Sequence, residues 1–98
     1  GRIKIDMESK MVYMDGEKVV FSKKEFEVLS LLASNQGKTI SSERLFEEVW
    51  KAKYFKNDNN TVMVHIRHLR EKMSGPTGKC DFIKTVWGVG YKFETKDE

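Results

Sequence analysis

Four apolar residues, spaced for one face of a helix, place the strongest constraint on the fold of this chain. Val62, Ile66, Leu69 and Met73 follow an i, i+4, i+7, i+11 pattern. An α-helix turns by roughly 100° per residue, so the four side chains lie within about 40° of one line along the helix. A stripe this narrow has to be covered by other elements. The pattern therefore predicts a helix over residues 60–73, packed on a core.

A β-hairpin is predicted after this helix, over residues 82–94. Its two arms, FIKTVW and YKFE, are rich in β-branched and aromatic residues. Between them, Gly88 and Gly90 allow a sharp reversal and a close approach of the backbone to a ligand. The sequence Ser-Gly-Pro at 74–76 is expected to end the preceding helix.

The N-terminal fifth of the chain is predicted to form an antiparallel sheet over residues 3–21. Ile3 and Ile5 alternate with polar residues, as in a half-buried strand. Asp15 and Gly16 lie between two strand-like runs, and this dipeptide is a strong signal for a tight hairpin turn.

Two further helices are predicted over residues 23–36 and 42–50. Ser22 and Glu25 form a capping-box pattern at the start of the first, and Gly37 is expected to end it. The second would be capped by one of the serines at 41 and 42, and the third by one of the asparagines at 59 and 60. Residues 51–58 have no helical period, and we expect a loop anchored by the aromatic rings at 54 and 55.

The order is therefore sheet, three helices and hairpin. This predicts an α+β fold, a winged helix-turn-helix in which residues 82–94 are the wing. The length of 98 residues suits a single domain over 1–98.

Composition limits the classes of function. The formal net charge of +3 is a mild basic excess that suits a nucleic-acid partner without requiring one. Cys80 is the only cysteine, which excludes an internal disulfide and favours a reducing compartment. No stretch has the length of a membrane helix, and no signal-peptide pattern opens the chain. We therefore expect a cytoplasmic protein that does not bind a membrane.

The polar side of the third helix admits three interpretations. His65, His68 and Glu71 are metal-ligand types, but their spacing spreads them over about 120° of arc and nearby arginines would repel a cation. A merely solvated surface usually mixes charge signs, whereas residues 60–73 hold five potentially basic side chains and one acid. An anionic partner is favoured, because Asn, Thr, His and Arg can bond to base edges and phosphates.

Catalysis is not expected. We find no convincing pair of nucleophile and base, no paired carboxylates and no metal-ligand set, so neither a metal nor a cofactor is predicted. The Gly-Val-Gly at 88–90 is too short for a nucleotide-binding motif and does not lead from a strand into a helix. The main rival to nucleic-acid binding is a winged helix used as a protein-interaction module, whose binding would survive high salt.

The segment NNTVMVHIRHLREKM, followed by IKTVWGVGYKF, resembles the OmpR/PhoB-type winged-helix effector domains of two-component response regulators. The shared pattern is T-V-x-V-H-I-x-x-L-R-x-K with I-x-T-V-x-G-x-G-Y-x-F. FSKKEFEVLSLL and EEVW extend the resemblance to nearly the whole chain. The WGVGY form is similar to the VanR-like branch of vancomycin-resistance regulators.

The resemblance implies a four-stranded N-terminal sheet, a recognition helix 60–73 for the major groove of double-stranded DNA, and a wing 82–94 for the adjacent backbone or minor groove. Such proteins usually bind direct repeats as two copies placed head to tail. The loop 51–58 matches a segment that touches RNA polymerase in several members. Phosphorylation by a sensor kinase would act on a receiver domain, and this sequence contains no receiver segment.

The resemblance and the arc of the third helix together give a predicted set of DNA contacts. That set is Trp50, Asn60, Thr61, Val64, His65, Arg67, His68, Arg70, Lys72, Thr85, Trp87 and Tyr91. Thr61, Val64, His65, His68 and Lys72 are expected on one arc, and Arg67 nearly opposite the apolar stripe.

Two positions depart from the family pattern. Trp87 stands where many members have an arginine that enters the minor groove, and an indole cannot supply that charge. His68 stands where some relatives have arginine, and a neutral histidine makes fewer charged contacts.

Overall fold

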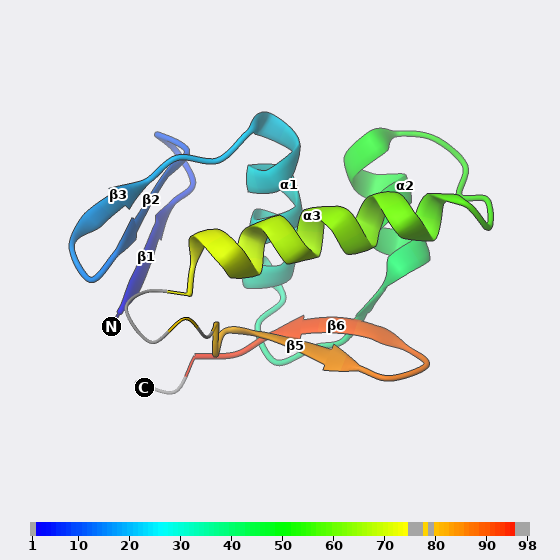
Figure 1. Ribbon diagram of the computed structural model, residues 1–98. Helices are drawn as coiled ribbons and strands as arrows, with labels where there is room; N and C mark the ends of the chain where they lie inside the picture. Colours follow the sequence, from blue (N-terminus) through cyan, green and yellow to red (C-terminus); the bar gives the residue numbers. More distant parts are fainter. Residues whose placement is uncertain (1, 75–77, 79, 96–98) are drawn as a thin grey trace.

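The computed structural model describes residues 2–74, 78 and 80–95. Its elements follow the predicted order of sheet, three helices and hairpin (Figure 1). In this view the N-terminal sheet lies on the left, the helices fill the centre and right, and the C-terminal hairpin runs beneath the longest helix. The predicted helix stop at 75–76 lies outside the described residues.

The N-terminal sheet has the strand order β1-β2-β3 and is antiparallel throughout. Its strands are β1 (Ile3–Asp6), β2 (Met11–Met14) and β3 (Glu17–Val19). The predicted Asp15-Gly16 turn is confirmed. Both residues have positive φ, 51° and 85°, as a tight primed hairpin turn requires.

The implied fourth strand of this sheet is not found among the described residues. The turn between β1 and β2 takes four residues, because the Asp6 carboxylate accepts the amides of Glu8 and Ser9 there. Pairing ends at Val19, and Val20 beyond it is 72% exposed. Three strands with their turns therefore use up the chain that precedes the first helix.

Helix α1 (Lys23–Ser34) begins with the predicted capping box. The Glu25 amide donates to Ser22 Oγ at 3.2 Å, and the Ser22 amide donates to Glu25 Oε1 at 2.9 Å. The helix ends two residues earlier than predicted because Asn35 caps it, donating through its side chain to the Leu31 carbonyl at 2.8 Å.

Strand β4 (Ile40–Ser41) was not among the predicted elements. It pairs with the C-terminal hairpin, and α2 (Ser42–Trp50) follows it at once with the predicted bounds. Ser41 caps α2, since its hydroxyl accepts the Arg44 amide at 3.1 Å.

Helix α3 (Asp58–Lys72) begins two residues before the predicted start. The Asp58 carboxylate accepts the Phe55 amide at 2.8 Å and so closes a turn that already leads into the helix. The predicted cap at Asn59 or Asn60 is therefore wrong. The predicted anchoring by Phe55 is also wrong, because its ring is 63% exposed.

The predicted apolar stripe of α3 is confirmed. Val62, Ile66, Leu69 and Met73 are each at most 1% exposed, and α3 packs on both α1 and α2. The residues that complete the core come from every other part of the fold: Val12, Met14, Phe26, Val28, Leu29, Leu32, Ile40, Leu45, Phe46, Val49, Phe82, Ile83, Tyr91 and Phe93.

The predicted wing forms from β5 (Ile83–Val86) and β6 (Gly90–Phe93), in a second sheet of order β4-β6-β5. Gly88 makes the reversal with φ of 79°. Gly90 was expected to face a ligand, but it faces the chain itself. A Cβ there would lie 2.1 Å from the Ile40 carbonyl oxygen, so only glycine lets β4 pair so closely.

Candidate nucleic-acid interface

A second stripe runs along α3 on the side opposite the core. Asn60, Val64, Arg67 and Glu71 each lie two residues before or after a member of the apolar stripe, about 200° away from it. All four are exposed. Val64 therefore lies on this outer stripe, at the edge of the predicted arc that is farthest from His65.

A groove of about 800 Å³ separates the N-terminal half of α3 from the wing. We call it the α3–wing groove. Seven of the twelve predicted contact residues line it: Asn60, Val64, Arg67, Arg70, Thr85, Trp87 and Tyr91. The fold thus brings together side chains from the helix and from the hairpin that follows it in the sequence.

The helix side of this groove has the chemistry of a surface that reads base edges. Asn59 and Asn60 offer amide donors and acceptors, Arg67 offers a planar fork of donors, and Met63 and Val64 offer apolar contact. Amides suit adenine, a guanidinium suits guanine, and apolar side chains suit the thymine methyl group. The groove can therefore distinguish bases rather than only attract phosphates.

An acid limits how much of α3 suits an anion. Glu71 lines a second hollow of about 510 Å³ together with Asp81, near the C-terminal end of the helix. Arg67 and Arg70 line the same hollow and offset these two carboxylates. The stretch of α3 from Asn59 to Arg70 contains no acid, and it is therefore the part that fits a polyanion best.

Arg70 ties the helix to the wing. Its Nη2 donates to Thr85 Oγ1 at 2.7 Å and to the Ile83 carbonyl at 3.1 Å, and its Nε lies 3.3 Å from the same carbonyl oxygen. The guanidinium also lies 5.8 Å from the centre of the Tyr91 ring. Three predicted contact residues are thus engaged with one another, and Arg70 sets the position of the wing relative to α3.

Replacing Arg70 with lysine should loosen the wing. Lysine keeps the charge but cannot reproduce the two-nitrogen fork, so we expect a loss of about 1–2 kcal/mol in the free energy of unfolding. Denaturant unfolding measures the loss, and faster hydrogen exchange of the Val89 amide would locate it. Arg67→Lys is the matched control, because Arg67 is exposed. Equal stability of both variants would contradict the role given to Arg70.

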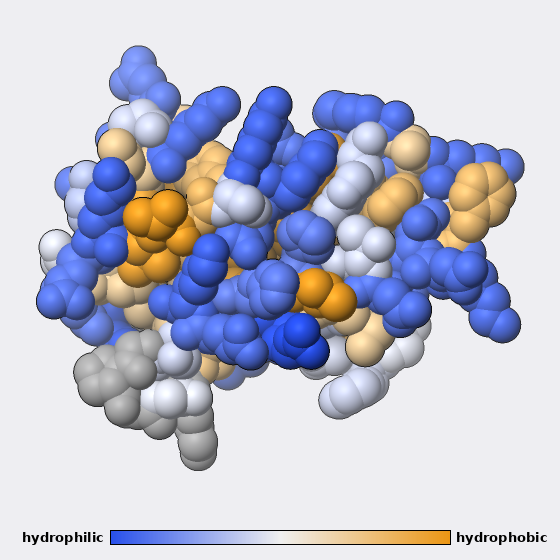
Figure 2. Space-filling view, turned by 45° about the horizontal axis from the view of Figure 1, so that its top comes forward, coloured by the Kyte–Doolittle hydropathy of each residue, from blue (hydrophilic) through white to orange (hydrophobic). Residues whose placement is uncertain are grey.

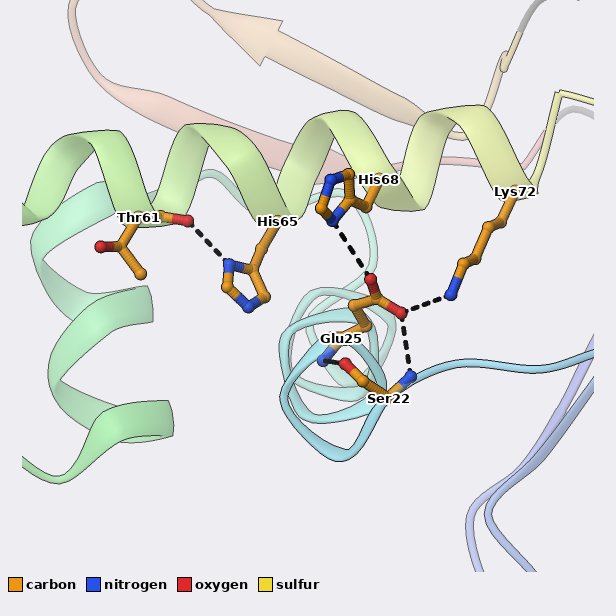
Figure 3. Close-up of polar contacts among 6 residues, drawn as sticks. All are labelled: Ser22, Glu25, Thr61, His65, His68 and Lys72. Carbon is orange, nitrogen blue, oxygen red and sulfur yellow. Dashed lines mark hydrogen bonds and ion pairs between the residues drawn. The ribbon is translucent and has the colours of Figure 1, made fainter.

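The other five predicted contacts lie on the side of α3 that faces α1 and α2, or on α2 itself. They are Trp50, Thr61, His65, His68 and Lys72. His65 Nδ1 is 2.8 Å from the Thr61 carbonyl oxygen, and as the N–H it donates within the helix (Figure 3). The His65 ring meets the Trp50 ring edge-on at 4.8 Å.

The His68 and Lys72 side chains point toward a buried carboxylate on α1 (Figure 3). Glu25, which is 6% exposed, accepts from Lys72 Nζ at 2.7 Å, and His68 Nδ1 lies 3.3 Å from its other oxygen. Burial alone would raise the pKa of Glu25. The bonds from Lys72 and the Ser22 amide, with the nearby charges of Lys72 and His68, outweigh burial and hold the pKa below its usual value.

Comparison with known proteins agrees with this geometry. Residues 16–93 match the family described as "Transcriptional regulatory protein, C terminal". The chain belongs to this family. It is 46% identical over 90 residues to Regulatory protein VanR of Enterococcus faecium, a match that covers 92% of this chain and 39% of VanR. The chain thus spans about two fifths of that relative.

Two solved structures show the same fold. The response regulator DrrB of Thermotoga maritima, described as an OmpR/PhoB homologue, superposes with a TM-score of 0.85 at 35% identity, covering 97% of this chain and 42% of DrrB. The DNA-binding domain of RstA from Klebsiella pneumoniae, solved in complex with the RstA box, gives 0.84 at 30% identity, covering 96% and 92%. The predicted OmpR/PhoB-type winged-helix effector domain is confirmed.

This effector domain contains groove residues that sequence reasoning missed. Asn59 was predicted only as a possible helix cap, and Met63 was not among the predicted contacts. Both line the groove, and Asn59 Nδ2 lies 3.3 Å from Met63 Sδ. Asn59 and Met63 have the same i, i+4 spacing as Asn60 and Val64, and this spacing could have indicated that the two pairs lie side by side on one face of the helix.

The described part of the effector domain shows neither a metal cluster nor a membrane span. Within residues 2–74, 78 and 80–95, no three side chains of His, Cys, Asp or Glu gather as they would to hold a metal ion. No helix in those ranges is both long enough and apolar enough to cross a bilayer.

Proposed function

We propose that this effector domain binds double-stranded DNA sequence-specifically and thereby controls transcription. The observation that carries the proposal is the α3–wing groove, in which base-reading side chains of α3 face a hairpin held at a fixed angle by Arg70. A helix that fits the major groove and presents its N-terminal residues to base edges is the usual arrangement for this motif. The solved RstA complex, in which the relative binds its DNA box, supports the same use here.

Within this proposal the outer stripe reads bases and the wing contacts the backbone. Asn60 and Val64 would meet base edges, and Arg67 a phosphate or a guanine. Thr85 and Tyr91 would lie beside the backbone that passes through the groove. The proposal does not include catalysis, because the matched family consists of transcription regulators.

The predicted contacts on the side of α3 that faces α1 and α2 are proposed to contribute less to DNA binding. Trp50, Thr61, His65, His68 and Lys72 would border the same major groove, where its phosphates pass. His68 and Lys72 already share Glu25, and His65 is held between Thr61 and Trp50. We therefore expect smaller losses on substituting them than on substituting the outer stripe.

The partners beyond DNA also remain proposals. We propose that two copies bind direct repeats head to tail, and that a receiver domain answering to a sensor kinase controls them in the cytoplasm. The loop at 51–58 would contact RNA polymerase, which suits the exposed ring of Phe55 beside Lys53.

Replacing Arg67 with alanine should weaken binding to every duplex. Loss of one phosphate contact lowers the slope of log affinity against log salt by about 1. Titration of labelled duplex at several salt concentrations measures both effects. Lys18→Ala, which removes an exposed charge on β3, is the control and should change neither. A salt slope equal to that of the parent would show that Arg67 does not hold a phosphate.

A further inference from the structure

The tip of the wing presents a large apolar surface to solvent. Trp87 is 89% exposed and Val89 is 57% exposed. The turn that carries them is well defined, since Gly88 has φ of 79° and the Val89 amide donates to the Val86 carbonyl at 2.9 Å. The indole is therefore held out on an ordered turn, and its exposure leaves little surface for contacts within its own chain.

Trp87 lies on the rim of the α3–wing groove. The same groove is lined by Asn60 and Val64 from α3 and by Trp87 and Val89 from the wing. A duplex whose major groove receives α3 would pass one strand of its backbone through this groove. The tip would then meet the minor groove on the other side of that strand, and a flat indole suits an opening about 6 Å wide.

The tip carries no charge with which to read that groove. Residues 86–90 are Val-Trp-Gly-Val-Gly. The basic side chains of the hairpin stand further back, where Lys84 and Lys92 are direct cross-strand partners. Two like charges placed opposite each other disfavour the free hairpin, although Glu94 offsets part of the repulsion, since its Oε2 lies 3.2 Å from Lys92 Nζ. They suit a hairpin whose flanks meet phosphates while its tip meets something apolar.

We propose that Trp87 is an apolar wedge that enters the minor groove and selects base steps that unstack easily. Apolar side chains inserted there act by partly separating base pairs and kinking the duplex. The energy required depends on the step, and pyrimidine–purine steps deform most readily. Trp87 would thus add sequence preference next to the major-groove site. This inference rests on the proposed DNA binding and goes beyond it.

The salt dependence of the affinity distinguishes an apolar wedge from a charged contact. Affinity that comes from neutralised phosphates falls with salt, whereas an apolar contact releases no counterions. Trp87→Ala should therefore lower affinity roughly tenfold without changing the salt slope. Trp87→Arg should steepen the slope by about 0.9, because it adds one cation.

The probe for this test is a duplex that the parent chain enriches from a random library. Parent, Trp87→Ala and Trp87→Arg are titrated on it at several salt concentrations. Val20→Ala is the control, since it removes an exposed apolar side chain next to β3, at the opposite end of the molecule from the wing tip (Figure 1). Because Trp87 is so exposed, its variants should fold as the parent does.

A second readout follows the DNA itself. The library enriched by Trp87→Ala should keep the major-groove motif and lose the preference at its flank. A 2-aminopurine placed at the flanking step should brighten with the parent, as unstacking predicts, and not with Trp87→Ala. The wedge would be overturned if Trp87→Ala kept both the flanking sequence preference and the affinity of the parent. It would also be overturned if the dependence of log affinity on log salt became weaker in that variant. A parent that enriches no duplex would instead overturn the proposed function.

Discussion

Alanine in place of Gly90 should destabilise the folded chain by about 3 kcal/mol or more, because the added methyl group meets backbone rather than a side chain that could move aside. A Cβ at this position would lie 2.1 Å from the Ile40 carbonyl oxygen and 2.8 Å from Ser41 Cα. The collision can be relieved only by separating β4 from β6. Chemical denaturation followed by circular dichroism measures the loss.

The matched control for this prediction is Gly88→Ala. A Cβ at Gly88 would meet nothing within 4 Å, but its φ of 79° still disfavours alanine. We expect that variant to lose only about 1 kcal/mol, the usual penalty for a left-handed non-glycine residue. A Gly90→Ala variant no less stable than Gly88→Ala would contradict the close pairing of β4 and β6.

The second large effect is expected at Glu25. Alanine there removes half of the capping box and leaves Lys72 and His68 without their shared carboxylate. Loss of a helix cap costs about 1 kcal/mol, and a hydrogen bond to a charged group contributes about 1.5–3 kcal/mol. Because the Lys72 and His68 side chains are partly exposed, we expect about 2 kcal/mol in total at pH 7. Thermal or urea unfolding of Glu25→Ala against the parent measures the loss.

Glu25→Gln separates the cap from the charge. Glutamine can complete a capping box, so this variant should lose less than Glu25→Ala. Equal losses in the two variants would mean that the ion pairs provide the whole contribution. A loss below about 0.5 kcal/mol in both would contradict the contacts of Glu25 with α3.

The Glu25 carboxylate should also make stability depend on pH. Its pKa in the folded chain is lowered, so the unfolded chain binds the proton more tightly. The stabilisation is therefore complete above the unfolded pKa of about 4.3 and is lost as pH falls through the folded value. Subtracting the unfolding free energy of Glu25→Gln from that of the parent isolates this contribution. Parallel curves for the two proteins from about pH 6 to pH 3 would contradict it.

The parts of the fold that could be predicted from sequence are those set by local spacing. The stripe through Val62 and Ile66 gave α3 its buried face, and Asp15-Gly16 gave the first hairpin its turn. In both cases the residues that form the sequence pattern are the same residues that form the predicted element. The capping box at the start of α1 is of the same kind.

Features set by distant residues could not be predicted. Strand β4 has two residues and no strand pattern of its own, and it exists because Gly90 lets β6 approach it. The contact of Glu25 with Lys72 spans 47 residues, and the capping pattern already explained Glu25 locally. Nothing in the sequence near either residue indicated the other.

The same limit explains why only some of the predicted DNA contacts line the α3–wing groove, while the others face α1 and α2. A helical arc gives the angle of each side chain but not the element that it faces. His68 and Lys72 were basic and off the core stripe, which made them resemble phosphate ligands, and α1 then proved to supply their anion. Asn60 and Arg67, on the far side, kept an open groove in front of them.

The most direct test of DNA recognition is selection of duplexes from a random library by this 98-residue chain at moderate salt. We expect enrichment of one short motif, with two copies in the same orientation about one helical turn apart. Enrichment of no motif, with only weak binding that salt abolishes, would reduce the groove to a generic phosphate surface. That result would contradict sequence-specific recognition by α3.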